Sequence, residues 1–126
     1  MRPETRAGNE NMHSDEIPFL ESGASLDEVF QLPRAVLYKH STRCGSSLRA
    51  MLEVERFART GPGVPVFAID VTRHRDVSDR AAKHLGVAHQ SPQAILIQAG
   101  GPVWSASHSL ITVSALVAAL QESPPG

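Results

Sequence analysis

The sequence predicts an α/β fold in which a four-stranded mixed β-sheet is flanked by helices. Three short apolar runs have the composition of buried strands, and they alternate with longer segments whose apolar residues recur at helical spacing. A fourth strand follows the third across the Gly100-Gly101 pair, which is typical of a hairpin turn. With 126 residues, the chain is long enough for one domain with a single core.

We expect a single domain over residues 17–122, between a disordered leader (residues 1–16) and a flexible tail (residues 123–126). The leader is polar and shows no periodicity, which is equally consistent with a scar of expression or annotation. There is no signal-peptide pattern, and no apolar run approaches the roughly 20 residues of a membrane span. We therefore expect a soluble, cytoplasmic protein.

Charge and cysteine content exclude several classes of partner and site. The net charge of −1 argues against a nucleic-acid surface. Cys44 is the single cysteine, which excludes an internal disulfide and a zinc or iron–sulfur site built from several cysteines of one chain. We expect no nucleic-acid or membrane partner, no metal site, no bound cofactor, and a thiol that stays reduced in the cytosol.

The first half of the chain predicts two helices and two strands. After a short apolar segment (residues 17–21), Ser25 and Glu28 fit a capping box that begins a helix ending before Pro33. The strands are Arg34–His40 and residues 66–69, the second of which closes at Asp70, and the helix between them follows Cys44 and runs to about Thr60. We expect the apolar stripe of this helix to face the core; it consists of Leu48, Met51, Leu52, Val54, Phe57 and Ala58.

The second half predicts a helix, a pair of strands and a last helix. The first helix runs from Arg73 to Leu85 and stops at Gly86, and the strands follow at residues 94–97 and 103–107. Thr112 caps the last helix, which ends at about Gln121. Two crossovers predict that the first three strands are parallel, and the hairpin adds an antiparallel edge. With its extra N-terminal helix, this order of elements is that of the thioredoxin fold.

Cys44 lies where the first strand gives way to a helix. Unpaired N–H groups and the positive end of the macrodipole favour an anion at a helix N-terminus, and they lower the pKa of a thiol from its usual value of about 8.5. Arg43, Lys39 and His40 add positive charge nearby in the sequence. These features predict a reactive thiolate. The alternative is a small buried residue that caps a core helix.

Pro92 precedes the third predicted strand. In a thioredoxin fold the loop at this place brings a cis-proline beside the thiol, so we predict a cis Ser91-Pro92 bond. The backbone of Ser91 would then pair with an extended substrate. An ordinary trans proline at the start of a strand is the alternative.

Three motifs occur in order along the chain: Lys39-His40-Ser41-Thr42 before the cysteine, the loop from His89 to Gln93, and Trp104 with Ser107 and His108. In these motifs, from about Leu26 to the last helix, the chain resembles the monothiol bacilliredoxin family (YtxJ-like proteins of thioredoxin fold). It departs from the family where proline and isoleucine usually follow the cysteine, because Gly45 and Ser46 stand there.

The resemblance implies a thiol-disulfide oxidoreductase with Cys44 as nucleophile. Ser47 stands where dithiol enzymes carry a resolving cysteine, so an external thiol or a disulfide reductase must resolve the mixed disulfide. The implied substrates are S-thiolated cytosolic proteins, from which Cys44 removes bacillithiol, the thiol co-substrate. We expect backbone N–H groups of Gly45 and Ser46 to face the thiolate, and the Ser47 hydroxyl to bond there or to stabilise the first turn.

The residues near Cys44 in the sequence differ in the roles expected of them. Arg43 is expected to meet a carboxylate-rich small thiol, although a solvated loop arginine fits nearly as well. At most one of Lys39 and His40 should face the site, because they end a strand. His89 is expected near the substrate groove, whereas Trp104 and His108 are expected to pack and to form hydrogen bonds.

Two other functions stay open. The tetrad from Cys44 to Ser47 is similar to the cysteine-glycine-x-serine of monothiol glutaredoxins, which implies a [2Fe–2S] cluster held between two subunits with glutathione as the alternative cofactor. The second is a redox-inactive thioredoxin-fold binding module in which Cys44 only packs.

Overall fold

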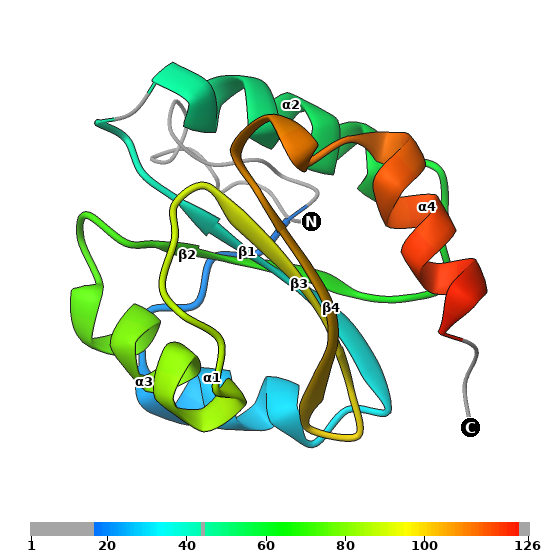
Figure 1. Cartoon of the computed structure of the whole chain (residues 1–126). Coiled ribbons are helices and arrows are strands. Elements are labelled where there is room, and N and C mark those ends of the chain that lie inside the picture. The colour runs from blue at the N-terminus through cyan, green and yellow to red at the C-terminus, as the bar shows by residue number, and fades with distance from the viewer. Residues whose placement is uncertain (1–16, 44, 124–126) are drawn as a thin grey trace, which may run out of the picture.

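The computed structural model describes residues 17–43 and 45–123. The expected leader, Cys44 and residues 124–126 of the expected tail lie outside the described residues. The helices are α1 (Gly23–Phe30), α2 (Gly45–Arg59), α3 (Arg75–Leu85) and α4 (Val113–Glu122), with a short 3-10 helix, η2 (His108–Leu110) (Figure 1). The strands are β1 (Arg34–His40), β2 (Val66–Asp70), β3 (Gln93–Gln98) and β4 (Gly101–Ser107).

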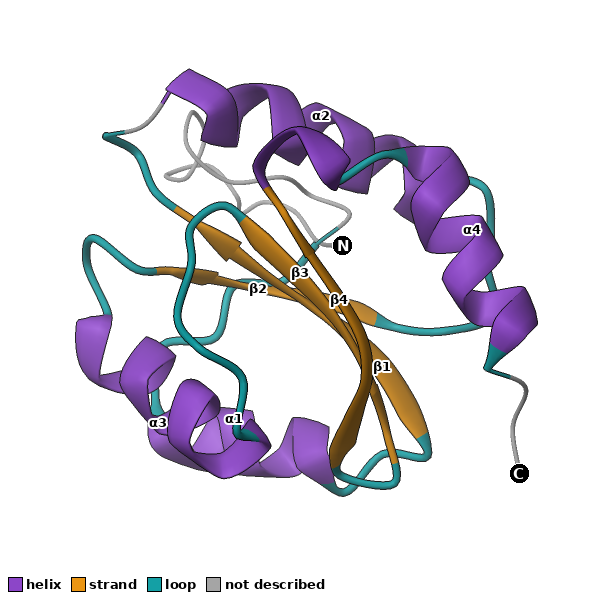
Figure 2. Cartoon of the chain, viewed as in Figure 1, coloured by secondary structure: helices purple, strands orange, loops and turns teal. Residues whose placement is uncertain are grey.

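The four strands form one mixed sheet in the order β2-β1-β3-β4. Helices α2 and α4 cover one face of this sheet, and α1 and α3 cover the other (Figure 2). The expected α/β fold with a thioredoxin-like, four-stranded mixed sheet is therefore confirmed.

The direction of β3 was predicted wrongly. β2 is parallel to β1, but β3 is antiparallel to β1, with Lys39 opposite Gln93 and Arg34 opposite Gln98. The reason is the connection after α3. Residues 86–92, between α3 and β3, number seven, the same as the residues of β1, and an extended segment of this length spans the sheet. The chain therefore returns to the end of the sheet where β1 finishes, and β3 starts from there in the opposite direction to β1. The hairpin of β3 and β4 is antiparallel, as predicted.

The sheet separates two apolar clusters, one beneath each pair of helices. Phe57 and Leu116 belong to the cluster under α2 and α4, and Leu26 and Val77 belong to the cluster under α1 and α3. Two residues of the predicted α2 stripe do not join the core, because Leu48 is 66% and Leu52 50% exposed. Met51, Val54 and Phe57 of the predicted stripe are buried as expected. Ser47 and Ala50 are buried with them, so the buried face of the helix is rotated from the predicted one.

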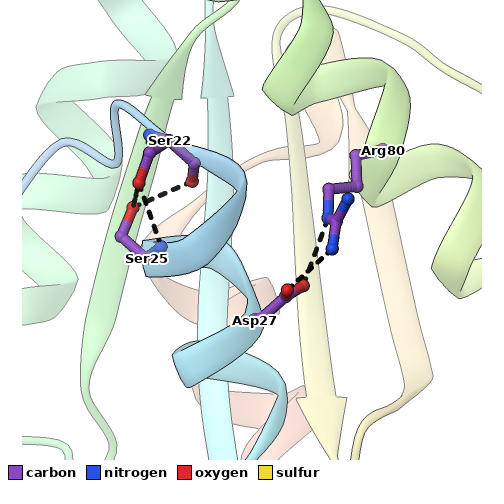
Figure 3. Close-up of polar contacts among 4 residues, drawn as sticks. All are labelled: Ser22, Ser25, Asp27 and Arg80. Atoms are coloured by element: carbon purple, nitrogen blue, oxygen red, sulfur yellow. Dashed lines mark hydrogen bonds and ion pairs between the residues drawn. The ribbon is translucent and has the colours of Figure 1, made fainter.

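Helix α1 begins earlier than the predicted cap at Ser25. Ser22 is the N-cap: its backbone is extended and its Oγ accepts a hydrogen bond of 3.1 Å from the backbone N–H of Ser25 (Figure 3). Ser25 is the N3 residue and completes the capping box, the role that the sequence had suggested for Glu28.

Helices α1 and α3 are joined by an ion pair on the surface. The guanidinium of Arg80 donates from Nε to Oδ1 of Asp27 at 3.2 Å and from Nη2 to Oδ2 at 2.7 Å (Figure 3). Both side chains are about half exposed, so the pair contributes little to stability.

The segment before α1 lies along the outer side of β2. Ala68 donates its N–H to the carbonyl of Pro18 at 3.0 Å and accepts from the N–H of Leu20 at 2.8 Å. Phe19 thus forms a single parallel bridge with Ala68. The expected strand or turn at residues 17–21 is this short bridge.

Candidate active site

The loop between β1 and α2 contains the expected nucleophile. Cys44 itself lies outside the described residues, but Arg43 before it and Gly45 after it are both exposed. Gly45 is the first residue of α2, and the first turn of that helix contains no acidic residue. Of the expected ligand contacts, Arg43, Gly45 and Ser46 are thus exposed around the start of α2.

Ser47 fixes the loop from the inside. It is fully buried, and its Oγ accepts a hydrogen bond of 3.2 Å from the backbone N–H of Ser41. Ser41 in turn accepts at its Oγ from the backbone N–H of Arg43 at 3.2 Å. The hydroxyl of Ser47 therefore stabilises the loop and the first turn, the second of the two roles expected for it.

A buried polar group beneath α2 holds the same turn. The hydroxyl of Tyr38 donates to the carbonyl of Ser47 at 2.9 Å and lies 3.1 Å from Nδ1 of His40. Because that hydroxyl has one proton, Nδ1 of His40 is the donor of the second bond. The period of two along β1 could have placed Tyr38 and His40 on one face, but the partner in α2 carries no sequence signal.

Lys39 points to the opposite face of β1 and is fully buried. Its Nζ donates to the carbonyl of Ser78 in α3 at 3.2 Å and to Nδ1 of His89 at 3.4 Å. Burial lowers the pKa of Lys39 to about 8, although the negative charge of Asp79 acts in the other direction. Lys39 and His40 thus lie on opposite faces of the strand, in agreement with the expectation that at most one of them faces the site, but the full burial of the Lys39 ammonium was not predicted.

His89 connects Lys39 to the surface. Its Nδ1 also lies 3.2 Å from Oγ of Ser78. Burial lowers the pKa of His89, and the positive charges of Lys39 and Arg75 lower it further, against the opposite effect of Asp79. Since the Lys39 ammonium has no acceptor, Nδ1 accepts from it, and the ring proton of the neutral histidine lies on Nε2.

A cavity of about 320 Å³ lies beside the β1–α2 loop. Its polar lining comes from three loops and the first residue of α3: Ser41, Arg43, Thr72, Arg75, His89 and Ser91. The structure thus brings the predicted site residues Arg43 and Ser91 to one cavity, and it places His89 there as expected. Thr72 and Arg75 were missed, because nothing in the sequence relates the β2–α3 loop to the cysteine.

The β2–α3 loop is shaped by the last residue of β2. Asp70 is buried, and its Oδ1 accepts from the backbone N–H of Thr72 at 3.0 Å and of Arg73 at 3.3 Å. Such an Asx turn directs the chain sharply into α3. It brings Thr72 and Arg75 to the cavity.

The Ser91-Pro92 peptide bond is cis, as predicted. Pro92 is buried, and its carbonyl accepts from the backbone N–H of His108 at 3.1 Å. Trp104 packs against the core beneath α2 and α4, and Nε2 of His108 lies 3.3 Å from Oε1 of Gln90. Both residues have the packing and hydrogen-bonding roles expected of them.

Residues 19–116 match the model of the monothiol bacilliredoxin family BrxC. The chain belongs to this family. The match covers the β1–α2 loop, the cavity and the sheet, so this bacilliredoxin is a member of a class of thiol-disulfide oxidoreductases with bacillithiol-linked chemistry.

Solved structures support the fold of this bacilliredoxin. One protein described as a candidate oxidoreductase with a thioredoxin fold is 30% identical, with a TM-score of 0.75 over 82% of this chain and 92% of its own. A thioredoxin from Trypanosoma brucei brucei (13% identity, TM-score 0.71) matches over 89% of this chain and 94% of its own. A variant thioredoxin from Halobacterium salinarum (19% identity, TM-score 0.69) matches over 87% of this chain and 93% of its own. The two thioredoxins show the fold alone.

Gly45 is the first of the two residues, Gly45 and Ser46, at which this bacilliredoxin departs from the family pattern. A Cβ added at Gly45 would meet no atom within 4 Å apart from its chain neighbours and the backbone of its own helix. Local space therefore does not require glycine there.

Among the described helices of this bacilliredoxin, none combines the length and apolar character needed to cross a bilayer.

Proposed function

We propose that this bacilliredoxin removes bacillithiol from S-thiolated proteins by a monothiol mechanism. The thiolate of Cys44 attacks the bacillithiol sulfur of the protein's mixed disulfide. The protein thiolate leaves, and a new disulfide joins Cys44 to bacillithiol. An external thiol or a disulfide reductase then attacks this disulfide, supplies the two electrons and regenerates Cys44.

One observation carries the monothiol mechanism. The position three residues after Cys44, where a dithiol enzyme has its resolving cysteine, holds Ser47, whose buried hydroxyl accepts from Ser41. The chain has no second cysteine. The second half of the reaction therefore needs a thiol from another molecule.

The surroundings of the loop support the choice of nucleophile. Cys44 is followed by a 15-residue helix that has no carboxylate in its first turn, and unpaired N–H groups at a helix start stabilise an anion. Arg43, which precedes Cys44, lines the same cavity as Ser91, the residue expected to pair with an extended substrate. We expect the protein substrate and the small thiol to meet at this place.

The test is the reduction of a bacillithiolated protein in the absence and presence of an external thiol. The wild-type chain should release the protein thiol in a single stoichiometric turnover without the external thiol, and catalytically with it. Mass spectrometry after the single turnover should find bacillithiol attached to Cys44. Cys44→Ser should neither release the protein thiol nor become linked to bacillithiol, whereas Ser47→Ala should still do both.

Two results would contradict the proposal. Undiminished release by Cys44→Ser would remove Cys44 as the nucleophile. A stable disulfide between Cys44 and the protein substrate, with bacillithiol released, would show that the attack takes place on the other sulfur.

A further inference from the structure

The cavity beside the β1–α2 loop is lined by groups that can donate hydrogen bonds. Arg43 in the β1–α2 loop and Arg75 at the start of α3 contribute two guanidinium groups, and Ser41, Thr72 and Ser91 contribute hydroxyls. No acidic residue of the described chain is among its lining residues. A lining of this kind suits an anion, because each polar contact with it can be a donated hydrogen bond and two of the donors are cationic.

His89 adds a donor whose orientation is fixed from behind. Its Nδ1 lies 3.4 Å from Nζ of Lys39 and 3.2 Å from Oγ of Ser78, both on the buried side. The ring proton is then on Nε2, and this N–H is the polar group that the ring offers to the cavity. His89 is therefore a neutral donor that complements the two arginines.

Arg75 is held over the cavity by its own helix. It is the first residue of α3, and its Nε donates to Oδ1 of Asp79 one turn later at 3.3 Å. Both side chains are well exposed, so this ion pair is weak and leaves the rest of the guanidinium to a ligand. Arg43, which precedes Cys44, lines the same cavity from the β1–α2 loop.

We propose that this cavity binds carboxylate groups of the small thiol that is transferred to Cys44, with Arg43, Arg75 and Nε2–H of His89 as contacts. The proposal rests on the transfer of a small thiol to Cys44, and it adds Arg75 and His89 to Arg43 as the residues that contact the carboxylates. Arg75 is a specificity-determining residue. It lies at the start of α3, away from Cys44 in the sequence, and its guanidinium attracts a negatively charged incoming disulfide.

The test compares two aromatic disulfides that react with the single cysteine and release a coloured thiolate. Dithiobis(nitrobenzoate) carries two carboxylates, whereas dipyridyl disulfide is neutral. Arg75→Gln should lower the rate constant for the carboxylate reagent by about fivefold, the factor that corresponds to about 1 kcal/mol for an exposed charge pair. It should leave the rate with the neutral reagent unchanged.

Two further variants serve as controls. Arg73→Gln removes a cation two residues before Arg75 that does not line the cavity, and it should leave both rates as in the wild type. Arg75→Lys keeps the charge and should restore much of the lost rate. The effect of Arg75→Gln should also shrink at high salt, since it comes from an exposed charge.

An equal loss with both reagents would overturn the proposal, because Arg75 would then act on the thiol. An unchanged rate with the carboxylate reagent would overturn it as well. The two proposals can fail separately. If the wild-type chain does not release bacillithiol but Arg75→Gln still slows only the carboxylate reagent, the carboxylate site is supported and the proposed reaction is contradicted.

Discussion

Nζ of Lys39 lies 3.4 Å from Nδ1 of His89, so a fully buried lysine of β1 supports a histidine that lines the surface cavity. The contact joins the strand that leads to Cys44 with the loop that leads to Pro92. It also places a titratable group inside the protein, and its consequences can be measured.

Lys39 should make stability rise with pH above about pH 8. Burial lowers the pKa of Lys39 from 10.5 to about 8, so between these values the unfolded chain binds more protons than the folded one, and the free energy of unfolding increases with pH. The full gain is on the order of 3 kcal/mol. Urea unfolding of the wild type and Lys39→Met at about pH 7 and about pH 10 measures it. The variant should lack this gain; parallel curves would show that Lys39 titrates alike in both states.

Tyr38→Phe should destabilise the loop that precedes Cys44. The substitution removes the hydroxyl that donates to the carbonyl of Ser47 and accepts from His40, in a place without access to water. Loss of a partner for buried polar groups costs about 1–3 kcal/mol. Ser105→Ala, which removes an exposed hydroxyl of β4, should change the unfolding free energy by less than about 0.5 kcal/mol. Equal effects of the two variants in urea unfolding would contradict the role of Tyr38.

A carboxylate at position 46 should make the thiol of Cys44 less acidic. Ser46 is exposed in the first turn of α2, which has no acidic residue. The pH at half-maximal alkylation by iodoacetamide is expected below the usual value of about 8.5 in the wild type. Ser46→Glu should raise it by about one unit at low salt, whereas the neutral Ser46→Gln should leave it near the wild-type value. A wild-type half-point at or above about 8.5 would contradict an activated thiolate.

Two glycine-to-alanine variants should have opposite effects on stability. Gly45 begins α2 and has open space around its Cα, so Gly45→Ala should stabilise by about 0.5–1 kcal/mol. Gly86 ends α3 with a left-handed φ of 67°, which a side chain rarely adopts, so Gly86→Ala should destabilise by about 1 kcal/mol. Thermal unfolding measures both. A loss of stability in Gly45→Ala would mean that α2 needs glycine at its start.

Local signals in the sequence predicted the elements well. The β1 strand has the predicted bounds, because Pro33 before it and the polar Ser41-Thr42 pair after it mark both ends of the apolar run. Gly86 and Thr112 end α3 and cap α4 as predicted. The hairpin was displaced by one residue, since Ala99 and Gly100, with φ of 53° and 80°, form the turn. An alanine with positive φ gives no sequence signal.

Long-range features were harder to predict. The direction of β3 depends on how far residues 86–92 travel, and composition does not specify that. The burial of Lys39 depends on its contacts with Ser78 and His89, which lie 39 and 50 residues away in the chain. For the same reason, Arg75 at the start of α3 was not assigned to the site, although Arg43 and His89 were.

The bridge of Phe19 with Ala68 has a consequence for the behaviour of this protein at high concentration. Open sheet edges invite another chain to add a strand, which is a route to aggregation. Residues 18–20 already occupy the backbone N–H and carbonyl of Ala68 on the outer side of β2. At the opposite edge, β4 contains Pro102, which has no N–H to offer. Each edge thus carries an obstacle to intermolecular strand addition.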